Sequence, residues 1–294
     1  MKLRDTKGDK IFNFICYFVV TVLTLSCLYP VYLVIINSFS DPEAVAVGKV
    51  TIIPVGFSLE SFKMVFQEKQ LMSGYWNSII YLVVGTAYNL LLTIPAAYAL
   101  SKKGLMGGSL VMKMIVFTMY FGGGLIPFYV TLRSYGLIDT RWVAILTGGV
   151  AATNLIIART FFKSGVPQEL EEAAEIDGCS PMQTFLKIVL PLSKAMLSVI
   201  TLYYAVGRWN GYTTSLYYQP TTPEYHSLQM VLRKLLLLAK HVYDVDPEMA
   251  EYYAKIANQL KYAAIVIASV PLLVVYPFLQ KYFEKGVMIG SVKG

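Results

Sequence analysis

Carboxylates gather in one short polar segment, which lies between two strongly apolar stretches. They are Glu169, Glu171, Glu172, Glu175 and Asp177, and no basic residue lies among them. On a short helix such charges repel one another by a few tenths of a kcal/mol per adjacent pair, which water tolerates but which gives no internal benefit. A partner molecule with basic groups would explain them. An ordinary solvated loop helix is the alternative that physics alone leaves open.

This acidic segment has helix signals at both ends. Pro167 suits the first turn, the carboxylates suit the positive end of the helix dipole, and Gly178 suits a left-handed stop. The sequence therefore predicts a helix of about three turns. One face of it carries residues at the i, i+3, i+4, i+7 spacing, and its two alanines allow close approach of another surface: Leu170, Ala173, Ala174 and Asp177.

A second helix start follows directly. Ser180 and Pro181 predict an N-cap with proline at the first helical position. The helix should continue to a kink near Pro191 and lead into the next apolar stretch.

Motifs for catalysis and metal binding are missing from the sequence. There is no Gly-x-x-x-x-Gly-Lys-[Ser/Thr] phosphate cradle and no His-Glu-x-x-His zinc motif. His226 and His241 fall in a polar segment, where we interpret them as surface residues, and the three cysteines have no ligand spacing. We therefore expect no catalytic residue and no metal ligand in this chain.

The composition is that of a polytopic membrane protein. Of the 294 residues, 56% are hydrophobic and 15% charged, and the mean hydropathy is +0.55. A bilayer core about 30 Å thick needs about 20 apolar residues in a helix. Six runs qualify, and they predict an all-α protein: residues 12–36, 76–100, 110–132, 142–162, 192–212 and 262–282.

Basic residues indicate how these spans are oriented. The net charge is +7, but the positive residues form short clusters between apolar runs, which fits anionic membrane lipids better than nucleic acid. Clusters precede the first span and follow the second, fourth and sixth, so the positive-inside rule places both termini in the cytoplasm. The acidic segment then lies in an inner loop, 164–191. Two long outer segments remain, 37–75 and 213–261, with short helices expected near 59–68 and 227–242.

Glycines occur inside two of the spans. Gly122, Gly123 and Gly124 lie in the third span, and Gly148 and Gly149 in the fourth. We interpret them as sites of close helix packing.

The inner loop resembles the EAA loop of ATP-binding cassette (ABC) importer permeases. The match consists of Glu172-Ala173-Ala174, then Gly178, then Ile188-Val189-Leu190-Pro191, with every gap at the family's spacing. Cys179 departs from the usual alanine. Further segments resemble the carbohydrate branch, most of all the permeases for complex oligosaccharides and alginate: residues 96–101, 124–127, 208–210 and 286–294.

The resemblance implies one permease domain over residues 1–294, with a type I importer fold in the bacterial cytoplasmic membrane. The acidic helix around Glu172 would be the coupling helix, seated in a cleft of a cytoplasmic ATPase subunit. That subunit would bind ATP and Mg, so that this chain needs no cofactor. A solute-binding protein would deliver the substrate, a second permease would pair with this one, and the 286–294 tail would touch the ATPase. The implied coupling residues are Glu169, Glu172, Ala173, Ala174, Asp177, Gly178, Leu190 and Pro191.

A sugar pathway would need aromatic faces for ring C–H groups and polar groups for hydroxyls. The fifth span offers both kinds: Tyr203, Tyr204, Arg208, Trp209 and Asn210. The alternative is an interfacial aromatic belt with a snorkelling arginine. If Arg208 faces the pathway, it would favour acidic sugars.

Three other functions fit the sequence less well. An ion-coupled secondary transporter would place ionisable residues at mid-membrane, but the second, third and fourth spans have no acidic residue in their interiors. A membrane-embedded enzyme would need the motifs excluded above. A permease for another solute, such as a peptide, would share the same inner loop.

Overall fold

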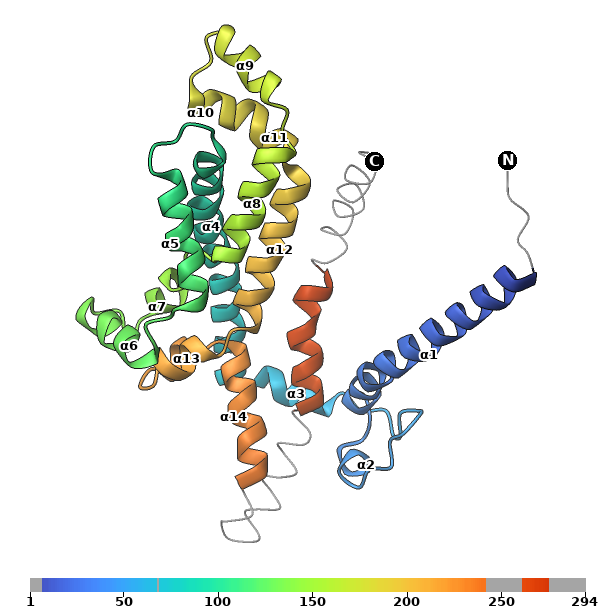
Figure 1. Ribbon diagram of the computed structural model, residues 1–294. Coiled ribbons are helices and arrows are strands. Elements are labelled where there is room, and N and C mark those ends of the chain that lie inside the picture. Colours follow the sequence, from blue (N-terminus) through green and yellow to red (C-terminus); the bar gives the residue numbers. More distant parts are fainter. Residues whose placement is uncertain (1–6, 68, 242–260, 275–294) are drawn as a thin grey trace. The chain divides into compact units, whose positions relative to one another are not determined.

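The structure is a computed structural model, which describes residues 7–67, 69–241 and 261–274. Regular structure within these residues is helical, apart from an isolated β-bridge between Ser40 and Phe57 (Figure 1). The first helices are α1 (Lys7–Ser38), α2 (Pro42–Ala46), α3 (Glu60–Gln67), α4 (Lys69–Ser101), α5 (Gly108–Tyr120), α6 (Leu125–Ser134), α7 (Arg141–Leu146) and α8 (Ala152–Ser164). Then come α9 (Gln168–Ile176), α10 (Pro181–Thr184), a π-helix (Phe185–Val189), α11 (Leu190–Leu192), α12 (Lys194–Asn210), α13 (Thr213–Tyr218), a 3-10 helix (Pro223–Tyr225), α14 (Leu228–His241) and a last helix, Lys261–Val274. The prediction of an all-α protein is confirmed.

The chain divides into two compact units, residues 1–68 with 232–269 and residues 69–231 with 270–294. In the first unit, α1 is exposed along most of its length, and Ile36 near its end packs with Ala44 and Val50. Helix α3 matches the short helix expected near 59–68. One membrane domain over residues 1–294 stays a prediction.

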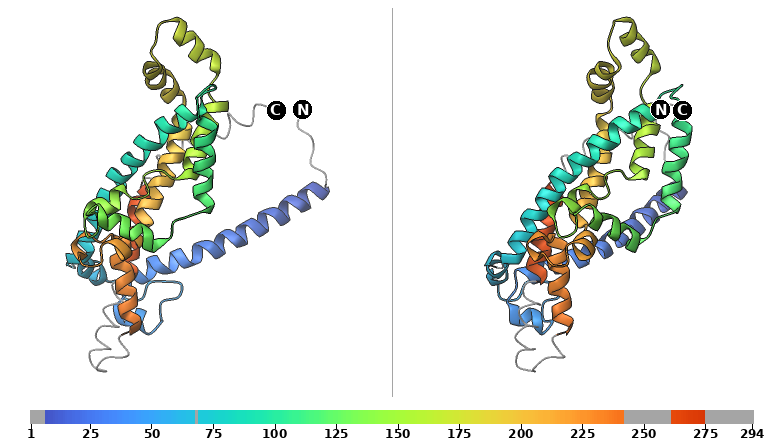
Figure 2. Two further views of the ribbon diagram at one scale, coloured as in Figure 1. Left: turned by 60° about the vertical axis from the view of Figure 1, so that its left-hand side comes forward. Right: turned by 90° about the vertical axis from the view of Figure 1, so that its left-hand side faces the viewer.

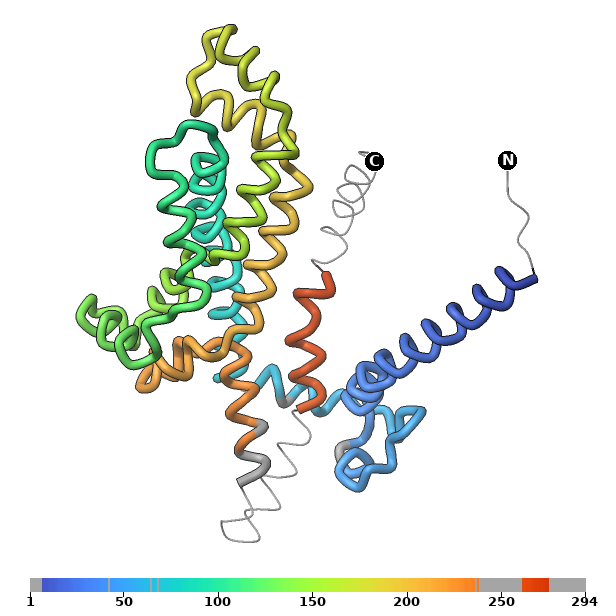
Figure 3. The backbone as a smooth tube through the Cα atoms, viewed as in Figure 1, coloured from blue at the N-terminus to red at the C-terminus, as the bar shows by residue number. Residues whose placement is uncertain are grey.

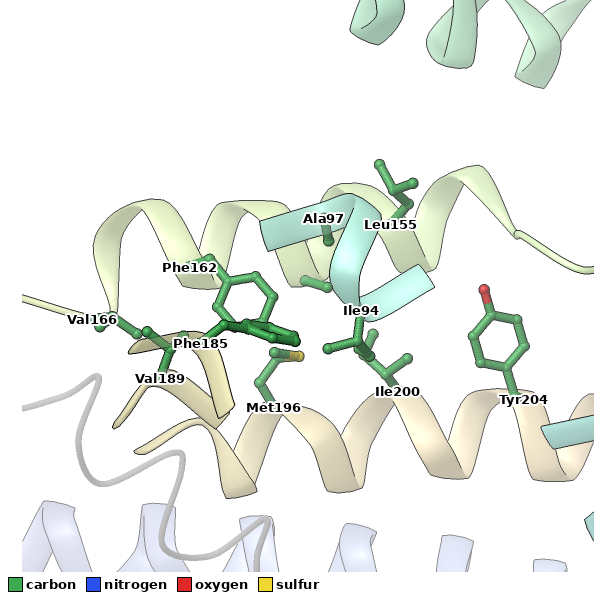
Figure 4. Close-up of a cluster of buried hydrophobic side chains, with 11 residues drawn as sticks. Ile94, Ala97, Leu155, Phe162, Val166, Phe185, Val189, Met196, Ile200 and Tyr204 are labelled. Carbon is green, nitrogen blue, oxygen red and sulfur yellow. The ribbon is translucent and has the colours of Figure 1, made fainter. Parts of the chain in front are cut away.

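The core of the second unit lies between α4, α8 and α12, which run side by side (Figures 1 and 2). Ala97 of α4 and Ala158 of α8 are fully buried, and such small residues let helix backbones approach closely. Phe185 and Val189 of the π-helix belong to the same buried cluster, which Figure 4 shows together with Tyr204. The core therefore ties the segment after α9 to the helix bundle.

The predicted first and second spans are confirmed as helices. Helix α1 contains residues 12–36 and α4 contains 76–100, and both are long and apolar enough to cross a membrane. Counting each bent helix pair as one span gives up to four among the described residues. Six spans stay a prediction, since residues 275–282 of the sixth lie outside the described residues, as do residues 242–260 and the 286–294 tail.

The third predicted span, 110–132, is a broken helix in the structure. Helices α5 and α6 meet at 116°, a change of direction that Figure 3 shows in green. Gly124 between them has φ 84°, and a Cβ added at Gly122 or Gly123 would meet nothing within 4 Å. These glycines therefore break the helix, and among the residues that the structure describes no neighbour packs closely against Gly122 or Gly123.

The fourth span is also interrupted, between α7 and α8. Gly148 has φ 68°, a conformation that glycine adopts without steric cost. A Cβ on Gly149 would lie 3.0 Å from the Tyr88 ring. The expected close approach is thus confirmed at Gly149, whereas Gly148 serves the break.

The fifth span, α12, is preceded by a separate helical segment, residues 181–192. Residues 181–192 and α12 meet at 83°, which confirms the kink predicted near Pro191. The π-helix before it was not predicted. The N–H of Leu190 bonds the carbonyl of Phe185 there, five residues back, next to a proline that has no N–H of its own.

Candidate functional site

Helix α9 forms from the signals that the sequence carries. Pro167 is the N-cap residue, and Glu169 and Glu171 lie in the first turn, where the helix dipole favours negative charge. Gly178 has φ 78°, and its N–H bonds the Glu175 carbonyl at 3.0 Å. The N–H of Cys179 bonds the Ala174 carbonyl at 2.9 Å, which completes a Schellman end.

The inner side of α9 is fastened to the end of α4. The hydroxyl of Tyr98 donates to Glu171 Oε2 at 3.2 Å, and Lys102 forms an ion pair with the same carboxylate. Lys103 donates to Gln168 Oε1 at 3.2 Å, and Ala174 is buried. Partial burial lowers the pKa of Lys102, while the neighbouring carboxylate favours its charged form.

The outer side of α9 is exposed to solvent. Leu170 is 43% exposed and Ile176 87%, and Ala173, Glu172 and Asp177 are exposed as well. The face predicted to meet a partner is therefore divided, because Ala174 points inward. The sequence analysis did not include Ile176 in the partner-facing surface, although an isoleucine in a polar segment is a visible signal of such a surface.

Helix α9 stands beyond the ends of α4, α8 and α12 in each view of Figure 2. We call residues 167–192, which form α9 and the bent segment after it, the elbow. Ser180 begins the second part with a capping box: its hydroxyl accepts from the Gln183 N–H at 3.3 Å, and Gln183 Oε1 accepts from the Ser180 N–H at 2.9 Å. The predicted N-cap at Ser180 and Pro181 is confirmed.

The elbow packs on the bundle through aromatic rings. Phe185 stacks on Tyr98 with ring centroids 4.7 Å apart, and Phe162 meets Tyr98 edge-on at 5.6 Å. Leu190 packs against the same cluster, whereas Pro191 is exposed. Tyr98 thus contacts both α9, through Glu171, and the π-helix, through Phe185.

The five predicted pathway residues are divided between different environments. Trp209 is 1% exposed and meets Tyr75 edge-on at 6.0 Å, and Tyr204 is buried. Tyr203 and Asn210 are exposed. The guanidinium of Arg208 lies against backbone carbonyls and Asn89, a network that the sequence did not predict. The pathway role of all five stays a prediction.

His226 is buried, which corrects the interpretation as a surface residue. It is 2% exposed, and its Nε2 lies 2.8 Å from the Gln219 carbonyl oxygen. Its own carbonyl accepts from Asn77 of α4 at 3.1 Å. The segment between α13 and α14 is therefore tied to α4, and not free as a polar loop would suggest. The predicted helix over 227–242 is confirmed by α14.

Groups of three or more potential metal ligands do not occur within the described parts of the chain.

Comparison with known proteins places this arrangement in a family. Residues 71–289 match the family model described as binding-protein-dependent transport system inner membrane component. The chain belongs to this family. The permease resemblance of the inner loop is thereby confirmed, and the match includes the whole elbow and α12.

Several members of this permease family are similar over nearly their whole length. The polygalacturonan/rhamnogalacturonan transport system permease protein YtcP of Bacillus subtilis (strain 168) is 37% identical, covering 97% of this chain and 99% of that protein. Protein LplC of the same organism is 38% identical, with 99% and 98% covered. A chain of a bacterial ABC transporter involved in the import of the acidic polysaccharide alginate has a TM-score of 0.85 at 32% identity, with 96% and 100% covered. The predicted importer fold is confirmed by this likeness.

Proposed function

We propose that this chain is the permease subunit of an ATP-driven bacterial importer of oligosaccharides, and that the elbow couples it to a cytoplasmic ATPase. The observation that carries the proposal is the two-sided character of α9. Its inner side is fastened through Glu171 and Ala174, while its outer side offers Leu170, Ala173 and Ile176 together with exposed carboxylates. An apolar patch with an acidic rim fits a basic-rimmed cleft of a partner protein.

The energy for transport would enter through that contact. The sequence has no phosphate cradle, so ATP and Mg would be bound by the partner ATPase subunits and this chain would be non-catalytic. Movement of the ATPase against α9 would shift Tyr98, Phe185 and the α11–α12 bend together, since these form one packed group. That shift would open the pathway toward a loaded solute-binding protein, with a second permease subunit forming the other half.

The substrate class is proposed from the relatives. YtcP is named for polygalacturonan and rhamnogalacturonan, and the solved transporter for the acidic polysaccharide alginate. A maltodextrin permease, MdxG of Bacillus subtilis, is 28% identical. We infer that this chain serves oligosaccharides that contain acidic sugars. The exposed Tyr203 and Asn210 would be candidates for the pathway wall.

Charge reversal on α9 tests the coupling role. We expect Glu172→Lys to lower ATP-driven oligosaccharide uptake at least about tenfold, the factor that a loss of about 1.4 kcal/mol in binding gives. Uptake would be measured in proteoliposomes that hold this chain, its second permease and its ATPase, with the solute-binding protein added. Glu60→Lys, at an exposed position of α3, is the matched control and should transport normally.

A backbone change at Gly178 tests the same role independently. Leucine is strained at φ 78°, whereas asparagine tolerates that region, so Gly178→Leu should uncouple uptake and Gly178→Asn should retain it. Normal uptake by both Glu172→Lys and Gly178→Leu would contradict the coupling proposal. Uptake that survives ATP depletion but stops when ion gradients collapse would favour the secondary transporter instead.

A further inference from the structure

The break in the fourth span needs hydrogen-bond partners that its own helices do not supply. Between α7 and α8, residues 147–151 are not helical, and they interrupt an apolar segment. Backbone of this kind is tolerated at membrane depth only where protein or water satisfies its N–H and C=O groups. The structure shows which side chains do so.

Arg208 of α12 satisfies the end of α7. Its Nη1 donates to the carbonyl of Ala144 and its Nη2 to that of Ile145, the latter at 3.0 Å. These are carbonyls of the last turn, which have no partner within a helix. The guanidinium lies against bare backbone, because a Cβ on Gly85 would be only 2.9 Å from Arg208 Nε.

Asn89 of α4 satisfies the middle of the break. Its Nδ2 donates to the carbonyls of Gly148 and Gly149, at 2.7 and 2.8 Å. Its Oδ1 accepts from Arg208 Nε at 3.0 Å. This contact fixes the amide orientation that Asn89 needs as a donor, and Asn89 is itself fully buried.

Tyr204 of α12 satisfies the start of α8. Its hydroxyl oxygen accepts from the N–H of Ala151 at 3.0 Å and lies 2.7 Å from Thr93 Oγ1. Accepting from the backbone leaves the hydroxyl proton for Thr93. The donors and acceptors follow helical spacing, with Gly85, Asn89 and Thr93 four residues apart on α4.

We propose that Arg208, Asn89 and Tyr204 form a clasp that holds the break of the fourth span, and that Arg208 is a positioning residue in transport and not the receptor for an acidic sugar. Three donor groups of its guanidinium are already engaged by acceptors of the chain. Helix α8 joins this break to the elbow, so the clasp fixes one end of the helix whose other end α9 would move. This inference rests on the proposed transport function.

The deciding experiment compares uptake of a neutral and a uronate oligosaccharide by the reconstituted transporter. We expect Arg208→Gln to lower the maximal uptake rate of both about tenfold, with their ratio and the KM for loaded binding protein unchanged. Arg208→Lys should restore little, since one ammonium cannot reproduce the planar fork. A loss confined to the uronate substrate would overturn the clasp, and so would full activity of Arg208→Gln.

A second measurement is independent of transport. In the purified complex, hydrogen exchange of the peptide that spans 147–151 should be about tenfold faster in Tyr204→Phe than in the wild type, since the partly buried N–H of Ala151 loses its acceptor while the ring is retained. The control Tyr135→Phe, an exposed hydroxyl, should change nothing. Unchanged exchange in Tyr204→Phe would overturn the clasp even if wild-type uptake did not occur. Wild-type failure to transport, with the exchange result intact, would contradict the proposed function alone.

Discussion

Asp139 stabilises the turn between α6 and α7 in an unusual backbone conformation. Its φ is 57°, the left-handed region that few residues other than glycine adopt. Its Oδ1 accepts from the Thr221 N–H at 3.0 Å and from the Thr222 hydroxyl at 3.1 Å. The Asp139 N–H bonds the Tyr218 carbonyl at 2.8 Å. One carboxylate thus links this turn to the segment after α13.

A pH dependence follows from these hydrogen bonds. Partial burial opposes the charged form, but the bonds from Thr221 and Thr222 outweigh it and lower the pKa of Asp139 below the ordinary 3.8. A lowered pKa means that the stabilisation is fully present above the ordinary value and is lost as the pH falls through the lower one. We expect Asp139→Asn to remove this part of the acid sensitivity below about pH 4, measured by thermal unfolding of the purified complex over a pH series. An unchanged pH profile in Asp139→Asn would contradict the assignment.

Single residues also show what the sequence could and could not predict. Gly178 and Ser180 act on neighbouring backbone, so their roles as stop and cap followed from local order alone. Arg208 contacts carbonyls that lie more than sixty positions away in the sequence, and it contacts Asn89, which lies more than a hundred positions away. No local pattern encodes contacts over such sequence separations. His226 was misread for the same reason, because its burial depends on α4.

At the scale of the element, the elbow depends on its capping box. We expect Ser180→Ala to destabilise the start of α10 by about 1 kcal/mol, the typical loss for an N-cap serine. Hydrogen exchange of the amides of Met182, Gln183 and Thr184 would then be several-fold faster in the purified complex. Exposed Ser134, whose hydroxyl bonds only its own helix, provides the control as Ser134→Ala. Equal exchange at the start of α10 in Ser180→Ala and Ser134→Ala would mean that the cap does not stabilise this helix.

Apolar helices were predictable and their interruptions were not. The composition of residues 110–132 and 142–162 is continuous enough to predict single spans, but glycines at 122–124 and at 148–149 allow the chain to turn. Side chains of α4 and α12 satisfy the backbone of the second break. For α5 and α6, an exposed apolar surface remains around Tyr120, Phe121 and Ile126. The choice between packing glycine and breaking glycine depends on neighbours, which a single sequence does not reveal.

At the scale of the whole molecule, the orientation of the chain remains a prediction that can be measured. Cys179 follows α9 and is partly exposed, while Lys49 lies in the segment after α1. After Cys16 and Cys27 are replaced by alanine, we expect a membrane-impermeant maleimide to label Cys179 only in inverted vesicles. With Cys179 also replaced, Lys49→Cys should be labelled only in right-side-out vesicles. Labelling of both positions from the same side would contradict the positive-inside assignment.

The π-helix before Pro191 has a consequence for how the elbow could change in related chains. Successive residues of an α-helix are rotated by about 100° about the helix axis. The wider π-turn at Phe185–Val189 holds one residue more than an α-turn. Removing a single codon there would rotate α9 about the axis of residues 181–192, which meets α12 at 83°, without altering any side chain of α9. The direction in which the acidic helix points is thus specified by a residue count, and a relative could redirect it by an insertion or deletion alone.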